Sequence, residues 1–201
     1  MPEYTFSTSS SGDYKERGSS FYAVAHSVSD VVDVKSKLLI IKEKFPNASH
    51  ICYAYRIKMG QRLDEFLSDA EEPKGSAGLS ILNVLKRQNL INSAIFVIRY
   101  FGGKKLGIPG LIYAYRSVSE NAIQNAELIP WLEKKQLLVT YPYKLEGIMK
   151  AILQKYKVEV IHENFGEKIN IQLVIDVKST DEILNSIKEI SADSAQIIIE
   201  N

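Results

Sequence analysis

The first part of the chain alternates between two hydrophobic spacings, one typical of strands and the other of helices. Residues 21–28 form a continuous run of small and apolar side chains, which predicts a buried strand. Asp30 is a suitable helix cap, and apolar residues then recur at steps of three and four until Pro46 ends the helix. Residues 50–57 alternate instead, which predicts a strand. The side chains expected to face the core from this strand are Ile51, Tyr53, Tyr55 and Ile57.

Less regular segments separate these elements. Residues 7–20 are rich in serine and glycine, and they predict a flexible arm after a short strand at residues 4–6. Residues 58–75 are polar and acidic and predict a long loop. Ser76 is then placed to cap a helix that runs to about Gln88.

A glycine-rich loop joins the next two predicted elements. Residues 94–101 predict a second buried strand, and glycines are frequent in the segment that follows, residues 102–110. Pro109 suits the first turn of a helix that continues to about residue 126.

The last third of the chain has a more regular pattern. After a boundary at residues 128–135, the spacing predicts a strand, a helix, two strands, a helix and a final strand. This is the order of the ferredoxin-like split βαβ unit. We therefore expect an α+β protein with one domain over residues 1–130 and a ferredoxin-like domain over residues 136–201.

Composition and charge narrow the class of protein. The chain has 201 residues, 45% of them hydrophobic and 24% charged, and its net charge of +1 makes it no general binder of polyanions. Residues 136–201 carry 7 basic and 10 acidic residues, which leaves 18 and 14 in residues 1–135, so the positive excess belongs to the first domain. A single cysteine, no signal-peptide pattern and no apolar run of membrane-spanning length predict a cytoplasmic protein without a membrane partner.

The glycine-rich loop is the strongest candidate for a binding site. Glycines such as Gly102, Gly103 and Gly107 allow a close backbone approach, and the following helix offers unpaired N–H groups. Lys104 and Lys105 add positive charge, and Arg99 precedes the loop. These features predict an anion or phosphate site, with a tight structural turn carrying solvated lysines as the alternative. We also expect Arg116, on the next helix, to belong to a basic groove.

A second candidate is the acidic segment at residues 68–78, which contains Asp69, Glu71 and Glu72. Crowded carboxylates can hold a divalent cation, tune one another for acid–base work, or pair with the basic loop. A solvated acidic loop is the simplest interpretation, and we expect neither a metal nor a cofactor.

His50 and Cys52 share one face of a predicted strand, an arrangement that a Cys–His catalytic pair would need. Nothing in the sequence orients such a pair, so packing is the preferred interpretation. His50 and Arg56 are expected at the rim of the site. The tyrosines and phenylalanines near the basic residues suit base stacking if they are exposed, and core packing otherwise.

Together these segments resemble the IMPACT/YigZ family. The family motif D-D-G-E-P-x-G-T-A-G is matched at Asp69, Glu72, Pro73, Gly75, Ala77 and Gly78. The motif R-Y-F-G-G-x-K-L-G-x-G-G-L-x-R-A-Y is matched from Arg99 to Gly103, from Lys105 to Gly107, and at Gly110, Leu111, Ala114 and Tyr115. The H-x-C-x-A-Y strand of the family is matched at residues 50–55.

The resemblance implies a first domain like the second domain of a small-subunit ribosomal protein, with a two-layer sandwich that contains a βαβ unit. It also implies a small second domain similar to the last domain of elongation factor G. Eukaryotic relatives act in translation control, so the implied partners are RNA, the ribosome or a translation-control protein. The sequence departs from the family motifs at Ala70, Glu71, Ile108 and Tyr113.

Three functions are compatible with these features. We favour a non-enzymatic, translation-linked protein that binds nucleic acid or the ribosome through the glycine-rich loop. The alternatives are a hydrolase that acts on a phosphorylated or peptide substrate around His50, Asp69 and Glu72, and a protein–protein adaptor that docks through its C-terminal sheet.

Overall fold

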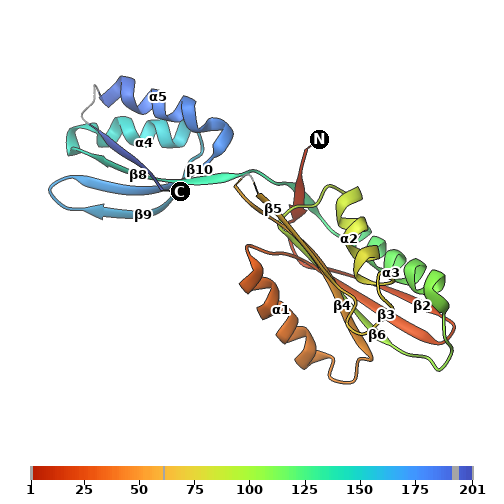
Figure 1. Ribbon diagram of the computed structural model, residues 1–201. Helices are drawn as coiled ribbons and strands as arrows, with labels where there is room; N and C mark the ends of the chain where they lie inside the picture. The colour runs from red at the N-terminus through yellow and green to blue at the C-terminus, as the bar shows by residue number, and fades with distance from the viewer. Residues whose placement is uncertain (1, 61, 192–194, 201) are drawn as a thin grey trace. The chain divides into compact units, whose positions relative to one another are not determined.

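The computed structural model describes residues 2–60, 62–191 and 195–200, and it divides into two compact units, Met1–Trp131 and Leu132–Asn201 (Figure 1). Both units combine helices with antiparallel sheets, so the predicted α+β class is confirmed. None of the helices among the described residues has both the length and the apolar character required to cross a bilayer.

An antiparallel five-stranded sheet organises the first unit, with the strand order β2-β3-β6-β4-β5. Its strands are β2 (Ser10–Glu16), β3 (Ser19–Ser27), β4 (His50–Met59), β5 (Arg62–Ser68) and β6 (Ser93–Tyr100). Two short strands, β1 (Tyr4–Phe6) and β7 (Leu128–Pro130), pair with each other outside this sheet. The central strand β6 is buried on both faces over most of its length, which agrees with its continuous apolar sequence.

Helices cover both faces of this sheet. The helices α2 (Gly78–Arg87) and α3 (Gly107–Gln124) pack on one face and form the larger core, while α1 (Val31–Lys44) packs on the other (Figure 1). The sheet with α2 and α3 forms the two-layer arrangement that was expected, and α1 adds a partial third layer. On β4 the predicted core side chains Tyr55 and Ile57 are buried in the core beneath α1, and Ile51 and Tyr53 are half-buried against it. The opposite side of the strand, expected to face away from the core, is also buried at Cys52 and Ala54, because α2 and α3 cover that face of the sheet.

Two segments predicted to be irregular are strands. The serine-rich arm contains β2, which pairs with β3 at the sheet edge, where a Cβ on Gly12 would lie 2.4 Å from the Ala122 backbone nitrogen of α3. The predicted acidic loop contains β5, another edge strand, where Phe66 stacks on Tyr55 with ring centroids 5.5 Å apart. Charged residues on these edge strands hide the alternation that would identify them.

The second unit has the predicted βαββαβ order. Its elements are β8 (Lys134–Tyr141), α4 (Glu146–Lys155), β9 (Glu159–Phe165), β10 (Ile169–Asp176), α5 (Thr180–Ser191) and β11 (Gln196–Glu200). The strands form an antiparallel sheet in the order β11-β8-β10-β9, and α4 and α5 lie side by side above it (Figure 1). Alternate residues of β8 and β10 enter a core of their own with the apolar faces of both helices.

Candidate functional site

Asp69 organises the turn that leads into α2. Its carboxylate accepts hydrogen bonds from the backbone N–H groups of Gly75 at 2.8 Å, Ala77 at 3.0 Å and Gly78 at 2.8 Å. The last two amides lie at the start of α2, so Asp69, and not Ser76 as predicted, caps this helix from outside it. The carboxylate is therefore occupied by its own chain.

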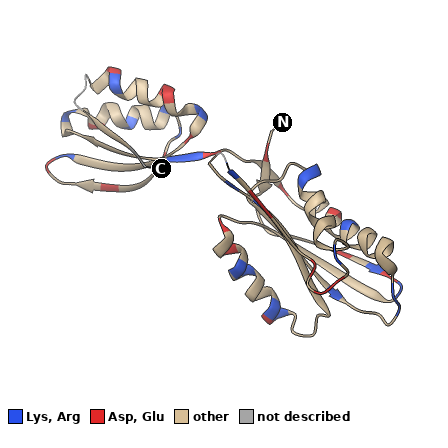
Figure 2. Ribbon diagram, viewed as in Figure 1, with Lys and Arg blue, Asp and Glu red and all other residues tan. Residues whose placement is uncertain are grey.

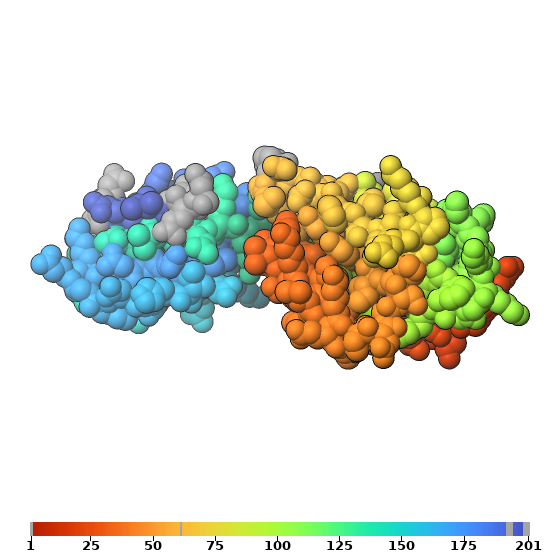
Figure 3. Space-filling model, turned by 60° about the horizontal axis from the view of Figure 1, so that its bottom comes forward, coloured from red at the N-terminus to blue at the C-terminus, as the bar shows by residue number. Residues whose placement is uncertain are grey.

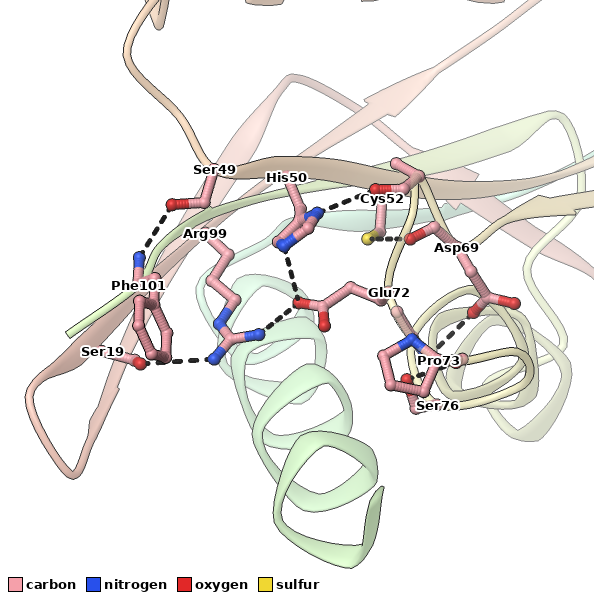
Figure 4. A network of polar contacts seen from close by, with 12 residues as sticks. Ser19, Ser49, His50, Cys52, Asp69, Glu72, Pro73, Ser76, Arg99 and Phe101 are labelled. Atoms are coloured by element: carbon pink, nitrogen blue, oxygen red, sulfur yellow. Dashed lines mark hydrogen bonds and ion pairs between the residues drawn. The ribbon is translucent and has the colours of Figure 1, made fainter. Parts of the chain in front are cut away.

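The second acidic residue of this segment, Glu72, lies at the centre of a buried polar network (Figure 4). Its Oε1 atom accepts hydrogen bonds from Arg99 on β6 at 2.5 Å and from the hydroxyl of Tyr115 on α3 at 2.8 Å. The side chains of Glu72 and Arg99 are 3% and 6% exposed, respectively, so this is a buried ion pair. The network ties the acidic segment to β6 and α3.

Aromatic rings and one serine surround the guanidinium of Arg99. The Cζ atom lies 5.4 Å from the ring centroid of Phe21 and 5.5 Å from that of Phe101, which are cation–π distances. One terminal nitrogen lies 3.5 Å from the Ser19 hydroxyl, and the buried Nε has no hydrogen-bond partner among the described residues. Arg99 was predicted to contribute to an anion site, but its charge already has an internal partner in Glu72.

Cys52 packs beneath this network and is fully buried. Its Sγ lies 3.0 Å from the Asp69 carbonyl oxygen, to which it donates, and 3.3 Å from the Tyr115 hydroxyl. Burial, which disfavours the thiolate, raises the pKa of Cys52 to about 12. Burial likewise raises the pKa of Tyr115 far above its usual range. The thiol is therefore a poor nucleophile at neutral pH.

His50 lies between the acidic segment and a cleft. Its Nδ1 is 2.9 Å from the Ala70 carbonyl oxygen, and its Nε2 is 4.0 Å from Glu72 Oε1. Since a carbonyl can only accept, Nδ1 carries a proton and Nε2 is directed at the carboxylate. The cleft has a volume of about 360 Å³. It is lined by His50, Glu72, Pro73, Arg99, Phe101, Lys105, Leu106, Gly107, Ile108 and Leu111.

The start of the glycine-rich loop is fixed by its own chain. The Gly102 N–H donates to the Ser19 hydroxyl at 3.1 Å, and the Phe101 N–H donates to the Ser49 hydroxyl at 3.0 Å. A Cβ on Gly102 would lie 1.9 Å from the Gly18 backbone carbon, so only glycine fits at this crossing. These contacts hold the loop against the β2–β3 turn.

The remainder of the loop is open. Among the described residues, none accepts a hydrogen bond from the backbone N–H groups of residues 103–106. The helix α3 begins at Gly107 with no side-chain cap, and both Gly103 and Gly107 have positive φ, at 82° and 70°. Lys104 and Lys105 are exposed, and neither forms an ion pair with any residue in the described part of the chain. The loop thus offers unpaired amides and two cations together.

Two predicted basic residues lie away from this cleft. Arg116 is on the exposed side of α3, where it pairs with Glu120 at 2.8 Å. Arg56 bonds to Glu65 and to the Leu90 carbonyl, and the β4–β6 register pairs it with Ser93, whereas His50 pairs with Arg99. Six strand residues span about 20 Å, so Arg56 is not at the rim of the cleft.

The sequence did not indicate the roles of Tyr115 and Ser19. The only sequence feature that pointed to Tyr115 was its place in the second family motif. No sequence feature pointed to Ser19. Within residues 2–60, 62–191 and 195–200, no group of three or more His, Cys, Asp or Glu is arranged to hold a metal ion.

Comparison with known proteins gives consistent results. Residues 17–123 match the family described as the Impact N-terminal domain. The chain is 30% identical over 161 residues to an IMPACT family member of Haemophilus influenzae, which covers 80% of this chain and 77% of that protein. It is also 30% identical over 161 residues to IMPACT family member YvyE of Bacillus subtilis, covering 78% and 72% of the two chains. A crystal structure described as a hypothetical protein has the same fold, with a TM-score of 0.72, 20% identity and coverage of 100% and 98%.

Proposed function

The chain belongs to the IMPACT family, and from that premise we propose that it is a non-enzymatic, translation-linked protein that binds RNA or the ribosome through its glycine-rich loop. The link to translation rests on the role that the family resemblance implies for eukaryotic relatives. The mode of binding rests on the geometry of the loop.

One observation carries the proposal: unpaired amides and unpaired lysines occur together in the glycine-rich loop. The N–H groups of residues 103–106 have no acceptor in the described chain, and they precede the positive end of the α3 dipole. Lys104 and Lys105 stand beside them in solvent. Such groups bind a phosphate of a nucleic-acid backbone: the lysine charges supply the affinity, and the amides orient the phosphate.

The state of the nearby reactive groups supports a binding role over a catalytic one. Asp69 is occupied by three amides, and Glu72 by Arg99 and Tyr115. Cys52 stays protonated at neutral pH because burial raises its pKa to about 12. Each of these groups is already engaged or buried within the chain itself, so the open loop is the part left to meet a partner.

The proposal is tested by the salt dependence of RNA binding. We expect a short fluorescein-labelled single-stranded RNA to bind the full chain at low salt, and its affinity to fall steeply between about 50 and 200 mM salt. The double variant Lys104→Ala/Lys105→Ala should weaken binding and reduce the slope of log K against log salt by about 1.4, or about 0.7 for each phosphate that is no longer neutralised. Fluorescence anisotropy measures both quantities.

A matched control separates the loop from net charge. The double variant Lys150→Ala/Lys155→Ala removes the same charge from exposed positions on α4 and should leave the slope unchanged. No binding at low salt, or equal slopes for the wild type and both variants, would overturn the proposal.

A second candidate, a hydrolase for a phosphorylated or peptide substrate, is favoured by one observation. His50 Nε2 and Glu72 Oε1 converge to 4.0 Å at the wall of a concave cleft, as an acid–base pair would. This function would be supported if the wild type hydrolyses p-nitrophenyl phosphate or labelled casein and the His50→Gln variant does not. If the wild type and His50→Gln are equally inactive, the binding proposal is preferred.

A further inference from the structure

We infer that an aromatic groove on the α1 side of the first unit is a stacking site for a base of single-stranded RNA. The groove is lined by Ser20, Tyr22, Phe45 and Tyr100 and has a volume of about 350 Å³. This inference rests on the proposed function, because it specifies where a base of the bound RNA lies when a phosphate occupies the glycine-rich loop.

The groove exists because α1 covers only part of its face of the sheet. The helix packs over β4 and β6 and ends at Lys44, with Phe45 at its C-cap. Figure 3 shows α1, in orange-red, on the surface of this side of the first unit. Beyond the helix, towards β3, the face is left open, and Tyr22 is 37% exposed there.

The two tyrosines form a preformed aromatic corner. The β3–β6 register places Ser20 opposite Tyr100, so Tyr22 and Tyr100 are diagonal neighbours on one face of the sheet. Their ring centroids are 6.2 Å apart at an interplanar angle of 79°. Neither hydroxyl forms a hydrogen bond with the described residues, so hydrogen bonding does not explain the exposed ring of Tyr22. A fixed, exposed aromatic ring is what a nucleic-acid base stacks on.

The charge around the groove suits a polyanion. Basic residues recur along α1 (Figure 2). Two lysines, Lys42 and Lys44, are in its last turn, just before the groove residue Phe45. Lys44 Nζ is 5.7 Å from the centroid of the Phe45 ring, and Lys15 on β2 pairs with Ser20 in the sheet register. The nearest carboxylates in the sequence are Asp13, Glu16 and Glu43. Asp13 pairs with Tyr22 in the sheet register and lies on the same face, whereas Glu16 pairs with Ser19 and lies on the opposite face. Lys15, Lys42 and Lys44 therefore outnumber the two carboxylates of this region that are not on the opposite face.

The groove and the glycine-rich loop meet at the end of β6, although the groove is on the α1 face of the sheet and the cleft beside the loop is on the α2 and α3 face. Tyr100 ends β6, and Phe101, whose exposed ring lines the cleft, follows it directly. Tyr100 and Lys104 are four positions apart in the chain, so their Cα atoms are at most about 14 Å apart. One strand of RNA can therefore place a phosphate at the loop and a base on Tyr22 within a few nucleotides.

The decisive experiment measures binding of fluorescein-labelled oligouridylate to the full chain by anisotropy at low salt. We expect Tyr22→Ala to weaken binding roughly 10- to 100-fold, as loss of one stacked base does, without changing the salt slope. Tyr22→Phe keeps the ring and should bind like the wild type. The matched control Tyr113→Ala removes a tyrosine that is 61% exposed on α3 and should bind like the wild type as well.

A second measurement does not depend on the folding of a variant. When oligouridylate is added to the wild-type protein, the ring protons of Tyr22 should shift upfield in the NMR spectrum because a base stacks over them. Ring protons that do not move while the RNA binds would overturn the inference.

The outcomes also separate this inference from the proposed function. If Lys104→Ala/Lys105→Ala weakens binding and Tyr22→Ala does not, the loop is the binding site and the groove is not part of it. If the protein binds no RNA at low salt, both proposals fail. If a proline-rich peptide binds in a Tyr22-dependent manner and RNA does not, the groove is a peptide site and the inference is overturned.

Discussion

The buried pair of Glu72 and Arg99 shows how single residues hold the cleft in shape. Breaking a buried ion pair by removing one partner leaves an uncompensated charge, which costs about 3–5 kcal/mol. We therefore expect Glu72→Gln to lower the free energy of unfolding by about that amount. Urea denaturation measures the loss.

An exposed pair provides the control for this prediction. Arg116→Ala removes an ion pair with Glu120 in which the arginine is 50% exposed. It should lower the free energy of unfolding by less than about 1 kcal/mol. If Glu72→Gln is no more destabilising than Arg116→Ala, the buried pair does not have the structural role assigned to it.

Cys52 gives a prediction about pH. Its pKa is about 12 in the folded protein, whereas an unfolded cysteine titrates near 8.5. Above that lower value the unfolded state loses a proton that the folded state keeps, so the stability from this group declines as the pH rises, by at most about 1.4 kcal/mol per pH unit. Urea denaturation should show that Cys52→Ala loses less stability than the wild type between about pH 9 and pH 11.

The reactivity of the same thiol provides an independent check. The folded protein should react with Ellman's reagent at neutral pH only on the timescale of unfolding, and rapidly in urea. Fast reaction of the folded protein would contradict the burial described for Cys52.

At this scale the sequence singled out Arg99 and Glu72 but did not predict that they pair with each other. Arg99 and Glu72 both belong to recognisable motifs, but they are 27 positions apart. No spacing rule indicates that Glu72 neutralises Arg99. Lys104 and Lys105 are exposed, as lysines usually are, and their binding of an anion stays a prediction.

Among the elements, the crossing of the glycine-rich loop over the β2–β3 turn is the most constrained. Gly102→Ala would force a Cβ to within 1.9 Å of the Gly18 backbone carbon, and neither backbone can move without breaking the Ser19 hydrogen bond. We expect this substitution to lower the free energy of unfolding by about 3 kcal/mol, which is the upper end of the usual cost of overpacking. Thermal or urea unfolding measures it.

The neighbouring glycine provides the control. Nothing lies within 4 Å of a Cβ on Gly103, whose φ is 82°. Gly103→Ala should therefore lower the free energy of unfolding only by the strain of placing an alanine in the left-handed conformation, about 1–2 kcal/mol. Equal losses for the two variants would show that the close approach to Gly18 is not what requires glycine.

Elements were predictable where one periodicity dominated. The capped helix α1 and the strictly alternating β10 were predicted, because the Asp30 cap and the inward isoleucines leave a clear pattern. The edge strands β2 and β5 were missed because their polar and charged side chains hide the alternation, although each pairs with its neighbour along the chain. The capping of α2 by Asp69 was missed because its carboxylate accepts from amides six to nine positions ahead, whereas a usual N-cap accepts from amides two or three positions ahead.

For the whole molecule, each unit has cores built only from its own residues. The only tryptophan in the chain, Trp131, is at the end of the first unit, where Lys58 Nζ lies 4.9 Å from its ring. A chain that ends at Trp131 should therefore fold and keep the fluorescence-detected unfolding midpoint of the full chain. A shift of this midpoint to much lower urea would contradict independent folding of the first unit.

The third candidate function, an adaptor that docks through the C-terminal sheet, stays a prediction. The face of the sheet that turns away from α4 and α5 is mixed. Its polar residues include Gln136, Thr140, Asn170 and Gln172, and its apolar residues include the half-buried Leu138 and Val174 and the well-exposed Ile198, which lies opposite Leu138. Docking faces of adaptors usually present a larger contiguous apolar patch. The first unit remains the part of the chain to which we assign partner binding.

The most direct test of the central claim follows the backbone amides of the glycine-rich loop during an RNA titration. In nitrogen–proton correlation spectra of the full chain, single-stranded RNA at low salt should shift the amide signals of residues 103–107 most strongly, and added salt should reverse the shifts. If these signals stay in place while RNA binds, or if the largest shifts fall on the C-terminal sheet, the glycine-rich loop is not the binding site.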